Sequence, residues 1–77
     1  MMILSIKRGC PWCHLAEAWL RQHGIAYKSV DVLSDPAAFA EMKRISGQSK
    51  VPVLITPDGK CLADFGPEEL PGFLGIP

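Results

Sequence analysis

The sequence predicts an α/β protein built on a four-stranded mixed sheet with helices on both faces, in the element order βαβαββα. One observation is an amphipathic helical pattern between two short apolar runs, which is typical of a parallel βαβ unit. The other is the turn signal Pro57-Asp58-Gly59, which joins two later strands into an antiparallel hairpin. The 77 residues contain no linker, internal repeat or low-complexity segment, so we expect one domain spanning residues 1–77.

The first half of the chain predicts a strand, a helix and a second strand. Residues 3–6 are a short apolar run, and residues 25–32 are rich in the β-branched and aromatic types that favour strands. Between them, from residue 11 to about residue 23, apolar residues recur every three or four positions and so share one helical face: Trp12, Leu15, Ala16, Trp19 and Leu20. Gly24 follows, and glycine readily adopts the left-handed conformation that ends a helix.

The second half predicts a helix, a hairpin and a last short helix. Ser34-Asp35-Pro36 supplies a capping side chain followed by proline at the first helical position. The apolar face of this helix is formed by Phe39, Met42 and Ile45. Residues 51–56 and 61–63 are the two strands of the hairpin. The last helix starts at Pro67, contains a poorly fitting Pro71, and packs through Leu70, Phe73 and Leu74.

The charge and composition argue against several classes of protein. Lys plus Arg number 8 and Asp plus Glu number 8, so neither nucleic acid nor an anionic membrane is expected as the main partner. No apolar run approaches the ~20 residues of a membrane span, and the apolar stretch at the N-terminus is too short for a signal peptide. The 3 cysteines are an odd and small set for a disulfide-stapled secreted domain. We therefore expect a cytoplasmic protein whose close cysteine pair is reactive or metal-binding.

The cysteine pair Cys10-Pro11-Trp12-Cys13 opens the first predicted helix. Pro11 suits the first helical position and places Cys10 at the N-cap, where its sulfur faces the unpaired N–H groups of the first turn. These donors and the helix dipole favour thiolate over thiol, and Lys7 and Arg8 add positive potential nearby. Cys10 is therefore the predicted nucleophile. Cys13 lies one helical turn further on and can reach back to Cys10 as the resolving thiol.

The same cysteine spacing also occurs in zinc and iron–sulfur sites. Zinc usually takes four ligands, and only Cys61, His14 and His23 could complete a set with the pair. A Cys-x-x-Cys pair that opens the helix of a βαβ unit is more typical of a redox site. We therefore expect no metal at the pair, a small hydrophobic role for Cys61, and a surface position for His14.

Beyond the cysteine pair, the order of motifs resembles the glutaredoxin family, whose fold is thioredoxin-like. The family pattern has Lys three residues before a Cys-Pro-aromatic-Cys site, as Lys7 stands before Cys10. The motifs that follow are similar to the family's second strand, its next helix start, and its Ser-Gly and Val-Pro elements: Tyr27 through Asp31-Val32, Asp35-Pro36, Ser46-Gly47 and Val51-Pro52. The resemblance spans Ile3 to about Leu70, and the order and spacing of the motifs together make it specific.

The resemblance implies glutathione as co-substrate, with no tightly bound cofactor. Pro52 is then the cis-proline that faces the active-site sulfurs, and Val51 offers its backbone N–H and C=O to the cysteinyl part of glutathione. Lys7 pairs with a glutathione carboxylate. Trp12, partly exposed between the cysteines, covers the dithiol and offers a flat surface to the substrate, whereas Trp19 belongs to the core.

The sequence departs from the family pattern at three places. Lys50 precedes Val-Pro where glutaredoxins usually have Thr. The family's Gly-Gly stretch near the fourth strand, which binds the γ-glutamyl end, is replaced by Ala63-Asp64-Phe65-Gly66, and Asp64 is the one side chain carried over to that role. Glu17 stands where the family tends to have Lys, and a carboxylate there works against a depressed thiol pKa.

These features favour a small dithiol oxidoreductase that uses glutathione to reduce protein disulfides or glutathionylated thiols. The alternative left open is a redoxin that is reduced by a flavoprotein reductase and serves one client, such as ribonucleotide reductase. More remote alternatives are a carrier of a glutathione-ligated [2Fe–2S] cluster, which Pro11 disfavours by resemblance, and a detached N-terminal domain of a glutathione transferase. The expected partners are glutathione and disulfide-containing or glutathionylated client proteins, and the expected state is a monomer.

Overall fold

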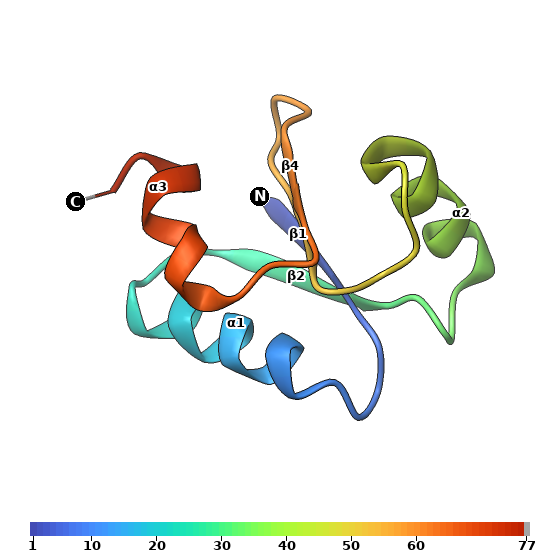
Figure 1. The fold of residues 1–77 in the computed structure, drawn as a ribbon, viewed down its shortest axis with the longest axis horizontal. Coiled ribbons are helices and arrows are strands. Elements are labelled where there is room, and N and C mark those ends of the chain that lie inside the picture. Colours follow the sequence, from blue (N-terminus) through green and yellow to red (C-terminus); the bar gives the residue numbers. More distant parts are fainter. Residues whose placement is uncertain (77) are drawn as a thin grey trace.

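The computed structural model describes residues 1–76, and its elements follow the predicted order βαβαββα (Figure 1). The four strands are β1 (Met2–Ile6), β2 (Tyr27–Asp31), β3 (Val53–Ile55) and β4 (Cys61–Ala63). The helices are α1 (Pro11–Gln22), α2 (Pro36–Ser46) and α3 (Leu70–Leu74), the last preceded by a 3₁₀ turn, η1 (Pro67–Glu69). The predicted α/β class is therefore confirmed.

The four strands form one mixed sheet in the order β2-β1-β3-β4. β1 and β2, which α1 connects, are parallel, whereas β3 is antiparallel to both β1 and β4. Both the βαβ unit and the hairpin that the sequence predicts are thus present. β1 and β3 are the two inner strands, and they carry the side chains that are buried on both faces.

Two apolar clusters lie on opposite faces of the sheet, because neighbouring residues of a strand point to opposite sides. Leu54 joins the cluster that α1 and α3 cover, together with Leu4, Ala16, Leu20, Phe65 and Leu70. Val53 joins the cluster under α2, with Val32 and Met42. Figure 1 shows α2 on the other side of the sheet from α1 and α3, so helices cover both faces as predicted.

The two longer helices begin where their capping residues predict. Cys10 caps α1 and Asp35 caps α2, and in each helix a proline occupies the first turn. The Asp35 carboxylate accepts the Ala38 N–H at 3.1 Å. At the end of α1 the His23 ring stacks on Trp19 with centroids 3.8 Å apart, and Trp19 packs at the edge of the core.

Two strands are shorter than predicted. The strand predicted over residues 25–32 begins at Tyr27, because the Ile25 N–H donates to the Leu20 carbonyl at 3.0 Å in the turn that ends α1. The strand predicted over residues 51–56 begins at Val53. Proline has no N–H to contribute to a strand ladder, so Pro52 lies before β3.

The prediction that Leu15 lies on the buried face of α1 is wrong, since its side chain is 49% exposed. The buried residues of α1 are Cys13, Ala16 and Leu20, which are themselves spaced by three and four. The small side chains of Cys13 and Ala16 face the sheet, and the neighbouring row that contains Leu15 and Trp12 faces outward.

Pro71 fits its helix better than expected. η1 and α3 meet at Leu70, so Pro71 falls in the first turn of α3. The N–H groups of a first turn have no partner within the helix, and a residue without an N–H therefore loses nothing there. Across residues 1–76, no helix is both long enough and apolar enough to cross a membrane.

Candidate active site

The predicted site residues come from three segments that meet at one edge of the sheet. In the ladder Ser5 pairs with Val53, and Val53 pairs with Ala63. The segment with the cysteines follows the end of β1, Val51-Pro52 precedes β3, and Asp64 follows β4. The sheet register therefore brings to one edge residues that are far apart in the sequence.

Cys10 is the N-cap of α1, as predicted. Its Sγ accepts the backbone N–H of Cys13 at 3.2 Å, and its side chain is partly exposed. The sulfur thus occupies the position where a helix offers unpaired donors and the positive end of its dipole, both of which stabilise an anion. An accessible sulfur in this position can act as a thiolate nucleophile.

Cys13, by contrast, is only 1% exposed. Burial raises the pKa of its thiol to about 12, and a hydrogen bond to Cys10 and the charges of Cys10 and Glu17 act in the same direction. A backbone hydrogen bond at Lys7 opposes them. Cys13 is therefore held as a neutral thiol beside Cys10, the arrangement expected of a resolving cysteine.

Lys7 links the cysteine segment to the loop before β3. Its ammonium donates to the Ser49 carbonyl at 3.0 Å and lies 5.0 Å from the centroid of the Phe39 ring. Lys43 places a second ammonium 4.6 Å from the same ring. Contacts with α2 and its following loop thus hold the Lys7 ammonium in place.

Arg8 and Glu17 are engaged by neighbouring groups. The Arg8 guanidinium forms an ion pair with Asp31 at 3.2 Å, at the end of β2. Glu17 accepts the hydroxyl of Tyr27 at 3.0 Å, and it raises the pKa of Cys13, as noted above. The carboxylate at position 17 therefore opposes ionisation of the Cys13 thiol.

The Val51-Pro52 peptide bond is cis, as the resemblance implied. Pro52 is buried, and its carbonyl accepts the Asp64 N–H at 2.9 Å, which ties the loop before β3 to the end of β4. The backbone N–H and C=O of Val51 have no hydrogen-bond partner among residues 1–76. They are therefore available to a bound extended peptide.

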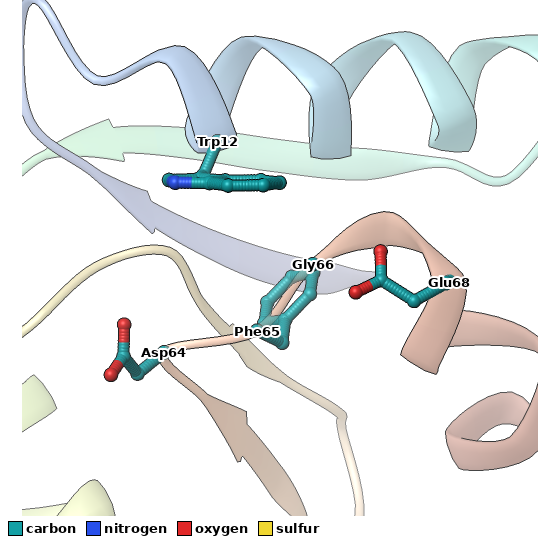
Figure 2. Close-up of a pocket in the computed structure, with 5 residues that line it drawn as sticks. All are labelled: Trp12, Asp64, Phe65, Gly66 and Glu68. Atoms are coloured by element: carbon teal, nitrogen blue, oxygen red, sulfur yellow. The ribbon is translucent and has the colours of Figure 1, made fainter.

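A pocket of about 190 Å³ lies between the start of α1 and the segment after β4. Its walls are Trp12, Asp64, Phe65, Gly66 and Glu68. Figure 2 shows the Trp12 ring over this segment, with the carboxylates of Asp64 and Glu68 on opposite sides of Phe65. The Trp12 side chain is 56% exposed, so the prediction that it is partly exposed beside the dithiol is confirmed.

Comparison with known proteins identifies the family. The glutaredoxin family model matches residues 2–62, which include the Cys10–Cys13 pair, the cis-proline and most of the sheet. The chain belongs to the glutaredoxin family. It is thus a glutaredoxin-like redox protein with a Cys-x-x-Cys pair, and the family is one of thiol–disulfide oxidoreductases.

Similar sequences and similar solved structures agree with this family assignment. It is 36% identical over 61 residues to a glutaredoxin-like 8.6 kDa protein in the rubredoxin operon of Clostridium pasteurianum, covering 79% of this chain and 80% of that one. A thioredoxin-like protein of known crystal structure superimposes with a TM-score of 0.87 at 26% identity, over 96% of this chain and 99% of the other. The predicted thioredoxin-like fold is therefore confirmed.

A third relative is the glutaredoxin-like NrdH-redoxin from Escherichia coli, which has a thioredoxin-like activity profile. Its structure superimposes with a TM-score of 0.74 at 25% identity, over 90% of this chain and 88% of that one.

Some of the curated sequence relatives are longer than this chain. The chain spans 34% of the length of the Listeria regulator Spx and 52% of the Neisseria meningitidis glutaredoxin.

Cys61 of this glutaredoxin-family protein lies away from the pair. Cys61 is half-buried under α2, on the opposite face of the sheet from α1, and its Sγ lies 3.8 Å from the Ile45 carbonyl oxygen. His14 is exposed. Within residues 1–76 no three His, Cys, Asp or Glu side chains are grouped so that they could hold a metal ion.

Sequence reasoning missed Glu68 and Phe65 as parts of the site. Both lie after β4, and only the folding of this segment back onto α1 brings them to Trp12. The one available signal was the position of Glu68 directly after Pro67, where a helical turn begins. That signal places a carboxylate at the start of a turn but does not say what the turn faces.

Proposed function

We propose that this protein uses glutathione to reduce protein disulfides or glutathionylated thiols, with Cys10 as nucleophile and Cys13 as resolving thiol. The observation that carries the proposal is the contrast between the two sulfurs. Cys10 is accessible and accepts a backbone N–H at the start of α1, whereas Cys13 is buried beside it as a thiol of raised pKa. Only one of the two is thus presented to a disulfide substrate.

The reaction proceeds by two exchanges. The Cys10 thiolate attacks one sulfur of a client disulfide, which forms a mixed disulfide and releases the first client thiolate. Cys13 then gives up its proton and attacks Cys10, which forms the Cys10–Cys13 disulfide and releases the second client thiolate. Two glutathione molecules restore the dithiol and leave as glutathione disulfide, so two electrons pass from glutathione to the client.

Five residues support a glutathione site next to Cys10: Lys7, Trp12, Val51, Pro52 and Asp64. Val51 has a free backbone donor and acceptor for the cysteinyl part, beside the cis-Pro52. Lys7 supplies a positive charge for a carboxylate of glutathione, and Asp64 a negative charge for the γ-glutamyl ammonium. Trp12 forms a wall of the same pocket as Asp64.

Glutathione acts in this proposal as a co-substrate and not as a bound cofactor. We place the reaction in the cytoplasm, where glutathione keeps thiols reduced, and we propose that the protein works as a monomer on its clients. Neither nucleic acid nor a membrane is required by any step.

A second candidate is a redoxin reduced by a flavoprotein reductase. The likeness to NrdH-redoxin, whose activity profile is thioredoxin-like, favours it. So does the replacement of the family's Gly-Gly stretch by residues 63–66. The chemistry at Cys10 and Cys13 is the same in both candidates, and they differ in the reductant.

The experiment supplies the protein with one of two reducing systems. The first is glutathione, glutathione reductase and NADPH, and the second is thioredoxin reductase and NADPH. The substrates are a protein disulfide and a glutathione mixed disulfide. Cys10→Ser is expected to abolish reduction of both substrates. Cys13→Ser is expected to keep reduction of the mixed disulfide and to lose that of the protein disulfide. Reduction by thioredoxin reductase alone would select the second candidate, and equal loss of both activities in Cys13→Ser would contradict the assigned roles.

A further inference from the structure

We propose that Trp12 and Leu15, together with the pocket beneath Trp12, form the docking surface for client proteins whose disulfide lies beside a basic side chain. This inference rests on the proposed reduction of protein disulfides and names the kind of partner. It extends the site beyond the residues assigned to glutathione, through Leu15 and Glu68.

The first observation is an exposed apolar pair beside the nucleophile. Trp12 is 56% exposed and Leu15 is 49% exposed. They are three residues apart on α1 and therefore adjacent on its outer surface, starting two residues after Cys10. Among residues 1–76, the other exposed large apolar side chains are Met1, Ile3 and Leu33, which lie just before or within β1 or after β2.

The second observation is the charge of the adjoining pocket. Asp64 and Glu68 both line it, and neither forms an ion pair among residues 1–76, where the ion pairs are Arg8–Asp31 and Arg44–Glu41. The Glu68 carboxylate lies directly against Gly66, and a Cβ at position 66 would push this flexible side chain aside. An aromatic face with carboxylates beside it is complementary to a guanidinium or ammonium group.

The charge pattern matches a client side chain better than it matches the γ-glutamyl end of glutathione. That end carries both an ammonium and a carboxylate, so the second acidic residue, Glu68, attracts one group and repels the other. An arginine or lysine side chain carries a cation alone. Client and glutathione react in alternate halves of the cycle, so both use the surface around Cys10 at different times.

The apolar pair has a separate role in this surface. An exposed Leu and Trp on one helix face gain free energy when a partner removes them from water. Glutathione has no large apolar side chain to cover Leu15, whereas a segment of a client protein commonly does. The preferred client segment therefore combines an apolar residue, a basic residue and the reactive cystine.

The test uses single-turnover reactions of protein that has been reduced with dithiothreitol and then freed of it. The substrates are two peptides with an internal disulfide, each containing a leucine and differing only by Arg or Glu next to one cysteine. Hydroxyethyl disulfide, which is small and uncharged, is the reference substrate. The variants are Leu15→Ser, Glu68→Gln and, as a matched control, Leu33→Ser, since Leu33 is 52% exposed.

Wild type is expected to prefer the Arg peptide. Leu15→Ser should lower the ratio of the Arg-peptide rate constant to the hydroxyethyl disulfide rate constant about fivefold, the effect of losing part of one leucine contact. Glu68→Gln should lower the preference for Arg over Glu by about threefold, as expected for a partly exposed ion pair. Leu33→Ser should leave both ratios unchanged.

Unchanged ratios in Leu15→Ser and Glu68→Gln, or an equal fall in Leu33→Ser, would overturn the docking proposal. Because the protein is reduced beforehand, these results do not depend on glutathione. Absence of peptide reduction by wild type would instead overturn the proposed function. Thermal unfolding of each variant shows whether a lower rate reflects a loss of fold.

Discussion

Replacing Cys10 by serine or by alanine separates its role as a helix cap from its role as a nucleophile. Both changes remove the sulfur and should abolish thiol–disulfide exchange. Serine keeps an oxygen that can accept the Cys13 N–H, now held by Cys10 Sγ at 3.2 Å, whereas alanine leaves that donor without an acceptor. The two inactive variants should therefore differ in stability.

The expected difference follows from the cap. Loss of an N-cap side chain costs about 1 kcal/mol, within a range of about 0.5–2 kcal/mol. In a domain of about this size, 1 kcal/mol lowers Tm by roughly 4–8 °C. Cys10→Ala should thus melt about 4–8 °C below Cys10→Ser, measured by circular dichroism at 222 nm in reducing buffer.

The N-cap of α2 provides a control for this measurement. Asp35 accepts the Ala38 N–H at 3.1 Å at the start of α2. Asp35→Ala should lose a similar ~1 kcal/mol while keeping activity. If Asp35→Ala is destabilised but Cys10→Ala and Cys10→Ser melt together, the first turn of α1 does not depend on an acceptor at position 10. That result would contradict the stabilisation of an anion at position 10 by the first turn of α1.

Three further predictions test other parts of the structure. The pKa of Cys13 is raised to about 12 from 9.0, so above pH 9 the unfolded chain releases this proton while the folded chain keeps it. The free energy of unfolding of the reduced protein should therefore fall as pH rises from 9 towards 12, by at most about 1.4 kcal/mol per pH unit. Urea unfolding at each pH measures this dependence, and Cys13→Ala should remove the part of it that Cys13 causes. Leu54 is 0% exposed, so Leu54→Ala should lower the unfolding free energy by about 2–5 kcal/mol, and a loss under 1 kcal/mol would contradict its place in the core. Asp64 has φ 52°, a conformation that Asn also tolerates, so Asp64→Asn should keep Tm while raising the glutathione concentration for half-maximal rate by up to about fivefold. A lowered Tm with unchanged glutathione dependence would assign Asp64 a structural role only.

The parts of the fold that local chemistry determines could be predicted from the sequence. A capping side chain followed by proline marks a helix start through its own hydrogen bond and its fixed φ, so Cys10 and Asp35 were found correctly. Periodicity gives the spacing of a buried row but not which of two neighbouring rows faces the sheet. The pattern therefore groups Leu15 with Ala16 and Leu20 on one face, whereas the structure buries Ala16 and Leu20 and exposes Leu15.

In the candidate site, too, the locally determined part could be predicted from the sequence and the long-range part could not. The cysteine pair is contiguous with the helix start that positions it, and its geometry follows from one turn of helix. The pocket depends on the segment after β4 folding back onto α1, a contact between residues more than fifty positions apart. Nothing near Glu68 in the sequence signals that contact, which is why its carboxylate was not expected beside Trp12.

The placement of the two sulfurs also fits the proposed order, in which Cys13 acts second as the resolving thiol. Two of the causes that raise the pKa of Cys13 come from Cys10, namely the hydrogen bond and the charge, and both require a free Cys10. When Cys10 enters a mixed disulfide, its sulfur loses the negative charge, so both causes disappear and Cys13 ionises more readily. Burial keeps Cys13 away from the client throughout, since its sulfur is covered by the fold. In the proposed cycle, the structure that withholds Cys13 from the substrate therefore eases its ionisation once Cys10 has reacted.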